Sequence, residues 1–145
     1  MKIVKHPAIL VATFLWIGFV LAISFMEAWI KFRAPGVTIP IGLGIGRLVF
    51  SALNKVEWFF ALLIAINFIL AKTQFYTKQN MLFYVPLLLL FLQTIWILPA
   101  LDTRAELIIQ GQTLPASTLH YYYVGMEIIK VICLTLFGIK LFKKK

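Results

Sequence analysis

Four polar residues near the C-terminus have the spacing of one helix face. They are His120, Tyr123, Glu127 and Lys130. Their separations of three, four and three residues match the α-helical repeat, so the four side chains should point the same way. Asn54 and Glu57, three residues apart, share a face in the same manner. Carboxylates and imidazoles bind divalent metals or transfer protons, so these two faces are the first candidates for chemistry.

The elements that must position these side chains are four long apolar stretches. They cover about 9–30, 48–71, 81–101 and 119–139. Each is long enough for a transmembrane helix, which takes about 20 apolar residues, and none alternates as a barrel strand would. Hydrophobic residues make up 62% of the chain and charged residues 13%, whereas a soluble domain is about 25% charged. The sequence therefore predicts an all-α fold, a polytopic integral membrane four-helix bundle with a single transmembrane domain over residues 1–145.

The basic residues predict the orientation of the helices. Eight lysines flank one set of helix ends, and four basic residues flank the other. The eight are Lys2, Lys5, Lys72, Lys78, Lys140, Lys143, Lys144 and Lys145, and the four are Lys31, Arg33, Arg47 and Arg104. Cytoplasmic flanks carry the excess of Lys and Arg. We therefore expect a multi-pass protein of the cell inner membrane, with both termini and the 72–80 loop in the cytoplasm.

Two outer loops, 31–47 and 102–118, are expected on the opposite side. The first is apolar but interrupted by Pro35, Pro40, Gly42, Gly44 and Gly46. That pattern breaks a helix while still favouring an apolar setting, so we expect a re-entrant or interfacial loop over the outer mouth of the bundle. Its glycines lack the preceding strand and the Gly-Lys-Ser/Thr ending of a phosphate loop, so nucleotide binding is not expected.

The polar residues of the helices gather in one half of the predicted bundle. The cytoplasmic halves contain no charged residue and no histidine. The outer halves contain Ser24, Glu27, Asn54, Lys55, Glu57, Gln93, His120, Tyr123, Glu127 and Lys130. With a rise of 1.5 Å per residue, Glu57 and Glu127 would lie about 10–15 Å inside the outer boundary. A carboxylate at that depth is expected to face the bundle interior and a polar partner.

Pairing within single helices can neutralise two of these carboxylates. Glu27 lies one turn before Lys31, in the favourable order for a helical ion pair. Glu127 lies three residues before Lys130 and can pair with it in the same way. Both pairs are consistent with a purely structural role.

Glu57 has no such local partner. It needs Lys130 or Arg47 from elsewhere in the fold. If Lys55 extends to the surface, then Glu57 and Glu127 compete for Lys130. One carboxylate must in that case be protonated, reach an arginine, or bind a cation.

The first function hypothesis is an outward-facing intramembrane site for a metal ion, a proton or a small ligand. The metal ligands would be Glu27, Glu57, His120 and Glu127, supported by Asn54, Gln93, Tyr123 and Lys130. Inward Glu and His residues build di-metal sites in helix bundles, but the Glu-x-x-His signature is absent, so a single divalent ion or a proton relay is expected at most. Bis-histidine haem is not expected, because His6 and His120 lie on opposite sides of an apolar layer about 30 Å thick.

The alternative is a non-catalytic accessory or assembly subunit of a membrane complex, whose polar residues only fix helix register. A small transporter would also need to oligomerise, and it lacks the expected internal duplication. The expected partners are the lipid bilayer and a membrane protein or a second copy of the chain. The net charge of +9 lies mostly at helix ends, which indicates lipid headgroups and not nucleic acid. The sequence contains no Gly-x-Ser-x-Gly and no Cys-x-x-Cys, so no enzymatic reaction is assigned.

The first two predicted helices carry one resemblance. Three segments carry it: Ser24 to Val37, Gly42 to Phe50, and Asn54-Lys-Val-Glu57. They resemble segments of uncharacterised small four-helix bacterial membrane proteins. The resemblance implies a four-helix membrane fold and carries no known activity.

Overall fold

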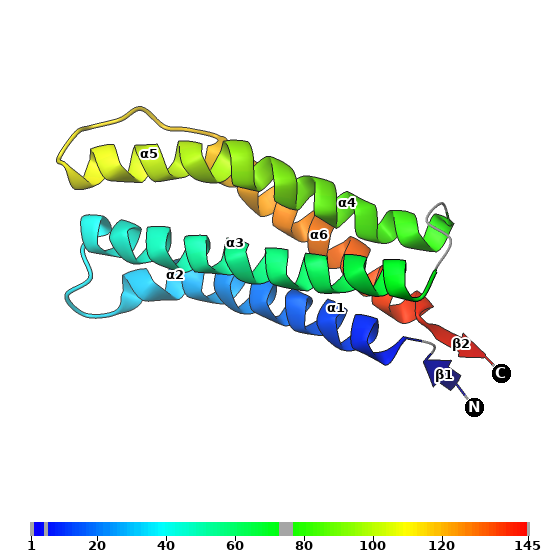
Figure 1. Ribbon diagram of the computed structural model, residues 1–145. Helices are drawn as coiled ribbons and strands as arrows, with labels where there is room; N and C mark the ends of the chain where they lie inside the picture. Colours follow the sequence, from blue (N-terminus) through cyan, green and yellow to red (C-terminus); the bar gives the residue numbers. More distant parts are fainter. Residues whose placement is uncertain (1, 5, 73–76, 145) are drawn as a thin grey trace.

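The computed structural model describes residues 2–4, 6–72 and 77–144. Within them are four helical spans long and apolar enough to cross a membrane: Pro7–Arg33, Ile39–Leu70, Lys78–Ile109 and Leu119–Lys140. Consecutive spans run antiparallel and pack side by side (Figure 1). This arrangement confirms the predicted fold class, an all-α bundle of four apolar helices.

Two of the spans change helix type along their length. Span one consists of α1 (Pro7–Val20), the π-helical segment η1 (Leu21–Glu27), α2 (Ala28–Ile30) and the 3-10 turn η2 (Lys31–Arg33). Span three consists of α4 (Lys78–Leu92), the π-helical segment η3 (Gln93–Ile97) and α5 (Leu98–Ile109). Spans two and four are the single helices α3 (Ile39–Leu70) and α6 (Leu119–Lys140). π-helical turns are rare and often lie at functional sites.

Two short strands bring the chain ends together. β1 (Lys2–Val4) pairs antiparallel with β2 (Phe142–Lys144). Both termini therefore lie at one end of the bundle, which we call the terminal end (Figure 1). The connections 34–38 and 110–118 lie at the opposite, distal end. Residues 73–76 of the predicted 72–80 loop, together with Lys5 and Lys145, lie outside the described residues.

The second span begins well before the predicted boundary. The segment 31–47, expected to be a re-entrant or interfacial loop, is helical from Ile39 onward, so that expectation was wrong. Thr38 caps the helix, with its hydroxyl accepting a hydrogen bond from the Ile41 amide at 3.5 Å. Pro40 lies in the first turn, where its missing N–H would have no helical partner anyway.

The glycines of the same segment permit close packing. A Cβ added at Gly42 would collide with the ring of Phe32, and one at Gly46 would lie 3.2 Å from Lys31 Nζ. The absence of side chains at these two positions therefore lets η2 lie directly against the first turns of α3. The helix-breaking tendency of glycine is outweighed here by the contacts that it allows.

The third span also continues further than predicted, to Ile109. The predicted outer loop 102–118 is therefore helical in its first half, and that boundary was wrong. Asp102 and Glu106 are four residues apart, so on a helix they lie on one face. Both contact Arg47 of α3, which fixes this extra helical length against span two.

The terminal half of the bundle is filled by apolar side chains. α1 packs against α3 and α6, while α4 packs against α6. Phe68, Phe83 and Phe137 form a mutual aromatic cluster, with ring centroids 5.4 to 6.1 Å apart. The buried Thr13 hydroxyl donates to the Ile9 carbonyl at 2.7 Å, so it brings no unpaired polar group into this region. Among the described residues, the buried charged side chains, Glu57, Glu127 and Lys130, are not part of this apolar core.

Candidate functional site

Side chains from all four spans meet in a buried polar cluster at the middle of the bundle. Its members are Trp16, Ser24, Glu57, Gln93, Tyr123, Glu127 and Lys130. Glu57 is 1% exposed, and Glu127 and Lys130 are not exposed at all. Charged groups this deeply buried are stable only when they are paired and hydrogen-bonded. The contacts within the cluster supply that pairing.

Lys130 lies at the centre of the buried cluster. Its Nζ lies 2.5 Å from Glu57 Oε2 and 2.7 Å from Glu127 Oε1. It also donates to Gln93 Oε1 at 2.7 Å. The ammonium has three protons and therefore satisfies all of them with three acceptors from spans two, three and four. Lys130 is thus the partner of Glu57, one of the two that the sequence predicted.

The two carboxylates have different surroundings. Glu127 also accepts hydrogen bonds from Gln93 Nε2 at 2.7 Å and from Ser24 Oγ at 3.1 Å. Glu57 Oε2 accepts one further bond, from Trp16 Nε1 at 2.7 Å. The ammonium of Lys130 and the indole of Trp16 thus bind the same oxygen of Glu57. Glu127 therefore accepts more hydrogen bonds from the protein than Glu57 does.

The π-helical segments supply two members of the cluster. Ser24 belongs to η1, and Gln93 is the first residue of η3. Both side chains are directed at Glu127. A helix that widens for one turn changes the direction of the side chains along it, so these segments bring one polar group from each of spans one and three onto the same carboxylate.

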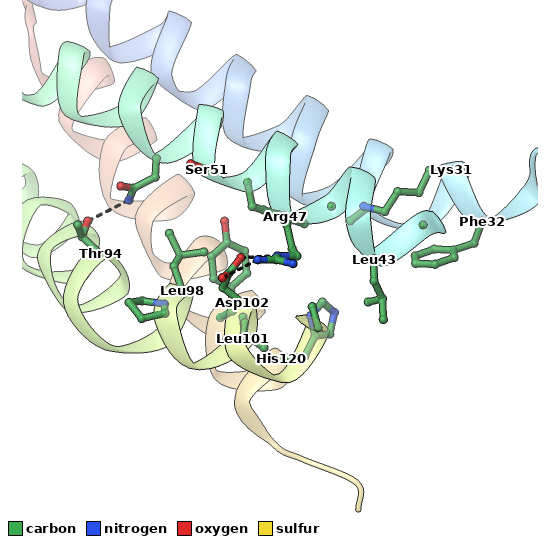
Figure 2. Close-up of a pocket in the computed structure, with 18 residues that line it drawn as sticks. Lys31, Phe32, Leu43, Arg47, Ser51, Thr94, Leu98, Leu101, Asp102 and His120 are labelled. Carbon is green, nitrogen blue, oxygen red and sulfur yellow. Dashed lines mark hydrogen bonds and ion pairs between the residues drawn. The ribbon is translucent and has the colours of Figure 1, made fainter. Parts of the chain in front are cut away.

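A cavity of about 520 Å³ lies at the distal end of the bundle (Figure 2). It is bounded by α3 and α5, with further residues from the end of span one and the start of α6. Most of its lining is apolar, as with Phe32, Leu43, Phe50, Leu98 and Leu101. Its volume and apolar character match those of pockets that bind small molecules.

The charged residues at the cavity are already paired. Figure 2 shows Arg47 meeting Asp102 across the cavity, with Nε 2.6 Å from Oδ1. The other side of the guanidinium contacts Glu106. Lys31 Nζ lies 3.1 Å from Glu27, confirming the expected pair. Both cations of the cavity, Arg47 and Lys31, are bound to carboxylates, so neither is free to attract an anionic ligand.

Two uncharged polar residues of the cavity have no such partner. His120 and Ser51 both line it, and among the described residues neither side chain has a hydrogen bond directed into the cavity. The imidazole of His120 lies near the ring of Tyr121, at a centroid distance of 6.5 Å. The imidazole and the hydroxyl can each donate and accept a hydrogen bond.

Tyr123 connects the cavity with the buried cluster. It lines the cavity, and its hydroxyl lies 3.4 Å from Ser24 Oγ. Tyr123 is buried, whereas its neighbours Tyr121 and Tyr122 are exposed. The turn of the helix explains the difference, because Tyr123 shares its face with Glu127.

The predicted metal ligands are distributed over separate contacts. Glu27 pairs with Lys31, Glu57 and Glu127 both bind Lys130, and His120 lines the cavity. Within the described part of the chain, no group of three or more His, Cys, Asp or Glu side chains could hold a metal ion. The geometry gives the metal interpretation no support, because the ammonium of Lys130 takes the place between the two glutamates.

Several contacts of the site had no clear signal in the sequence. Asn54, one of the supporting polar residues predicted from the sequence, donates to Thr94 Oγ1 at 2.9 Å. Trp58 donates to the same oxygen at 2.9 Å. Thr94 was not among the expected site residues, and neither was Trp16. Trp16 lies within an uninterrupted apolar run, where an indole looks like any other core residue.

Comparisons with protein-family models, with curated proteins and with solved structures found no match for this chain. The fold and the site therefore define its class. It is a bundle of four helices long and apolar enough to cross a membrane, with a buried polar cluster beneath a distal cavity.

Proposed function

We propose that this chain is a membrane protein that binds a small neutral amphiphile in the distal cavity. The observation that carries the proposal is the cavity itself, with about 520 Å³ of space and a mostly apolar lining. Pockets that hold small molecules share this size and combine apolar walls with a few polar groups that fix orientation.

The polar groups of the cavity favour an uncharged head group. Arg47 and Lys31 are bound to carboxylate partners, so an anionic head group would lose its hydration without gaining a free counter-charge. His120 and Ser51 can both donate and accept hydrogen bonds. A hydroxyl or carbonyl oxygen on an apolar body fits this combination.

The packing below the cavity favours binding over passage through the bundle. The terminal half is filled by buried apolar residues, including Ile64, Phe83 and Phe137. A path for a polar solute would need wetted polar groups along its whole length. We therefore propose a binding site that is accessible from the distal end only.

Decanol tests the proposal as a probe ligand. Native mass spectrometry of the detergent-solubilised protein should show one decanol retained by the wild-type chain and less retention of decanoate. Ser51→Phe should abolish retention, because the ring would occupy the cavity that Ser51 lines. Ala52→Phe is the matched control, since Ala52 is exposed like its neighbour but does not line the cavity.

Equal retention of decanol by the wild type and both variants would show that it binds at the lipid-facing surface. That result, or no retention by the wild type, would contradict the proposed site. It would favour the alternative in which the chain is an accessory subunit whose polar residues fix helix register.

We also propose that the protein lies in a cell inner membrane with both termini in the cytoplasm. The support is the sequence count, in which eight lysines flank one set of helix ends and four basic residues flank the other. Alkaline phosphatase fused after Lys145 should be inactive, whereas the same enzyme inserted in the 110–118 connection should be active. Activity in the first fusion and not in the second would reverse the topology.

A further inference from the structure

We infer that the buried cluster holds one exchangeable proton on Glu57 and exchanges it with the distal cavity through Tyr123. The starting observation is a count of charges. Two carboxylates, Glu57 and Glu127, share a single ammonium, that of Lys130. With all three groups ionised, the cluster would carry one uncompensated negative charge at full burial. Such a charge is strongly unfavourable, and binding a proton removes it.

No other charged side chain among the described residues compensates the cluster. Lys55 of α3 is exposed. Lys31 is held by Glu27, and Arg47 is held by Asp102 and Glu106. Spans one and three contribute only the neutral donors Trp16, Ser24 and Gln93.

The hydrogen bonds indicate which carboxylate carries the proton. Glu127 accepts from Gln93, Lys130 and Ser24, and bonds of this kind stabilise the ionised form. Glu57 accepts only at Oε2. Glu57 thus has fewer donors than Glu127 to stabilise a negative charge, so we place the proton on the Glu57 carboxyl group.

A continuous chain of contacts leads from the cavity to the carboxyl group of Glu57. Tyr123 lines the cavity and lies 3.4 Å from Ser24, which donates to Glu127 at 3.1 Å. Lys130 then bridges Glu127 and Glu57. A proton from water in the cavity enters at the Tyr123 hydroxyl as that group passes its own proton to Ser24. Ser24 passes a proton to Glu127. Lys130 then gives a proton to Glu57 and recovers one from Glu127. The net result is the transfer of a single proton from the cavity to Glu57.

This inference does not depend on the cavity holding an amphiphile, and its test uses no ligand. Infrared spectra of the wild-type protein in lipid at neutral pH should contain the carbonyl stretch of a protonated carboxylic acid, and the band should shift in D₂O. Glu57→Gln should remove the band, because one carboxylate then remains for one ammonium. The same neutralisation should leave this variant folded, which circular dichroism checks. Absence of the band from the wild type would overturn the inference.

Two further variants locate the proton without altering the charge count. Trp16→Phe should shift the band, because the indole bonds only to Glu57, whereas Ser24→Ala should leave it in place because Ser24 bonds to Glu127. The reverse result would overturn the assignment to Glu57.

Tyr123→Phe tests the route of the proton. This variant should keep the band but slow its shift in D₂O, and an unchanged rate would overturn the proposed route.

Discussion

Lys130→Met is expected to destabilise the protein by about 3–5 kcal/mol, the range typical of removing one partner from a buried ion pair. Lys130 is fully buried and binds two carboxylates. Methionine fills a similar volume but leaves Glu57 and Glu127 facing each other without a counter-charge. Unfolding by SDS titration in mixed micelles, followed by circular dichroism, measures the change.

Lys55→Met is the matched control for this prediction. It removes the same charge from a membrane-depth helix, but Lys55 is exposed, so little change in stability is expected. Combining Lys130→Met with Glu57→Gln should recover part of the loss, because only one carboxyl group that can ionise then remains in the buried cluster. Similar stabilities for Lys130→Met and Lys55→Met would contradict the central place of Lys130 in the buried cluster.

Phe137→Ala is expected to have the second large effect, near the lower end of the roughly 3–5 kcal/mol typical of buried Phe→Ala changes. Phe137 is fully buried and contacts Phe68 and Phe83. Because lipid is as apolar as the bundle interior, the loss comes mainly from packing and the cavity left behind, and not from transfer to water. The same SDS titration measures it.

Leu136→Ala removes a neighbouring apolar side chain from the outside of the same helix. Leu136 is 45% exposed on the surface that the lipid would cover, so its loss should change stability far less than the loss of Phe137. Equal effects of the two changes would contradict the assignment of Phe137 to the core of the terminal half.

The fold could be predicted from the sequence because a helix that crosses the hydrocarbon core of a bilayer must be apolar over about 20 residues. Four runs of sufficient length leave few alternatives to a helix bundle. The depth of Glu57 and the spacing of Glu127 and Lys130 also predicted an inward polar face, and both carboxylates do bind Lys130. Charge burial is costly enough that such residues almost always find one another.

The helix ends were mispredicted for identifiable reasons. Pro40 and the following glycines break helices in isolation, but here a cap at Thr38 and close packing against Phe32 favour a helix. Asp102 and Glu106 have loop-like composition, yet their shared partner Arg47 lies on another span. The composition of a short segment does not reveal contacts that its residues make with another helix.

The composition of the buried cluster also depended on features that sequence spacing does not reveal. Ser24 and Gln93 reach Glu127 from π-helical segments, where the regular 3.6-residue repeat is interrupted. A periodicity argument assumes an unbroken α-helix and therefore assigns the faces beyond such a turn incorrectly.

Photocrosslinking of a diazirine-bearing decanol in membranes tests the central claim, ligand binding in the distal cavity, most directly. Peptide mapping should place the label on residues that line the cavity in α3 and α5, such as Leu43, Phe50 and Leu98. Ser51→Phe should remove that labelling, and Ala52→Phe should preserve it. Labelling spread over lipid-facing positions of all four spans, equal in both variants, would contradict the proposed binding site.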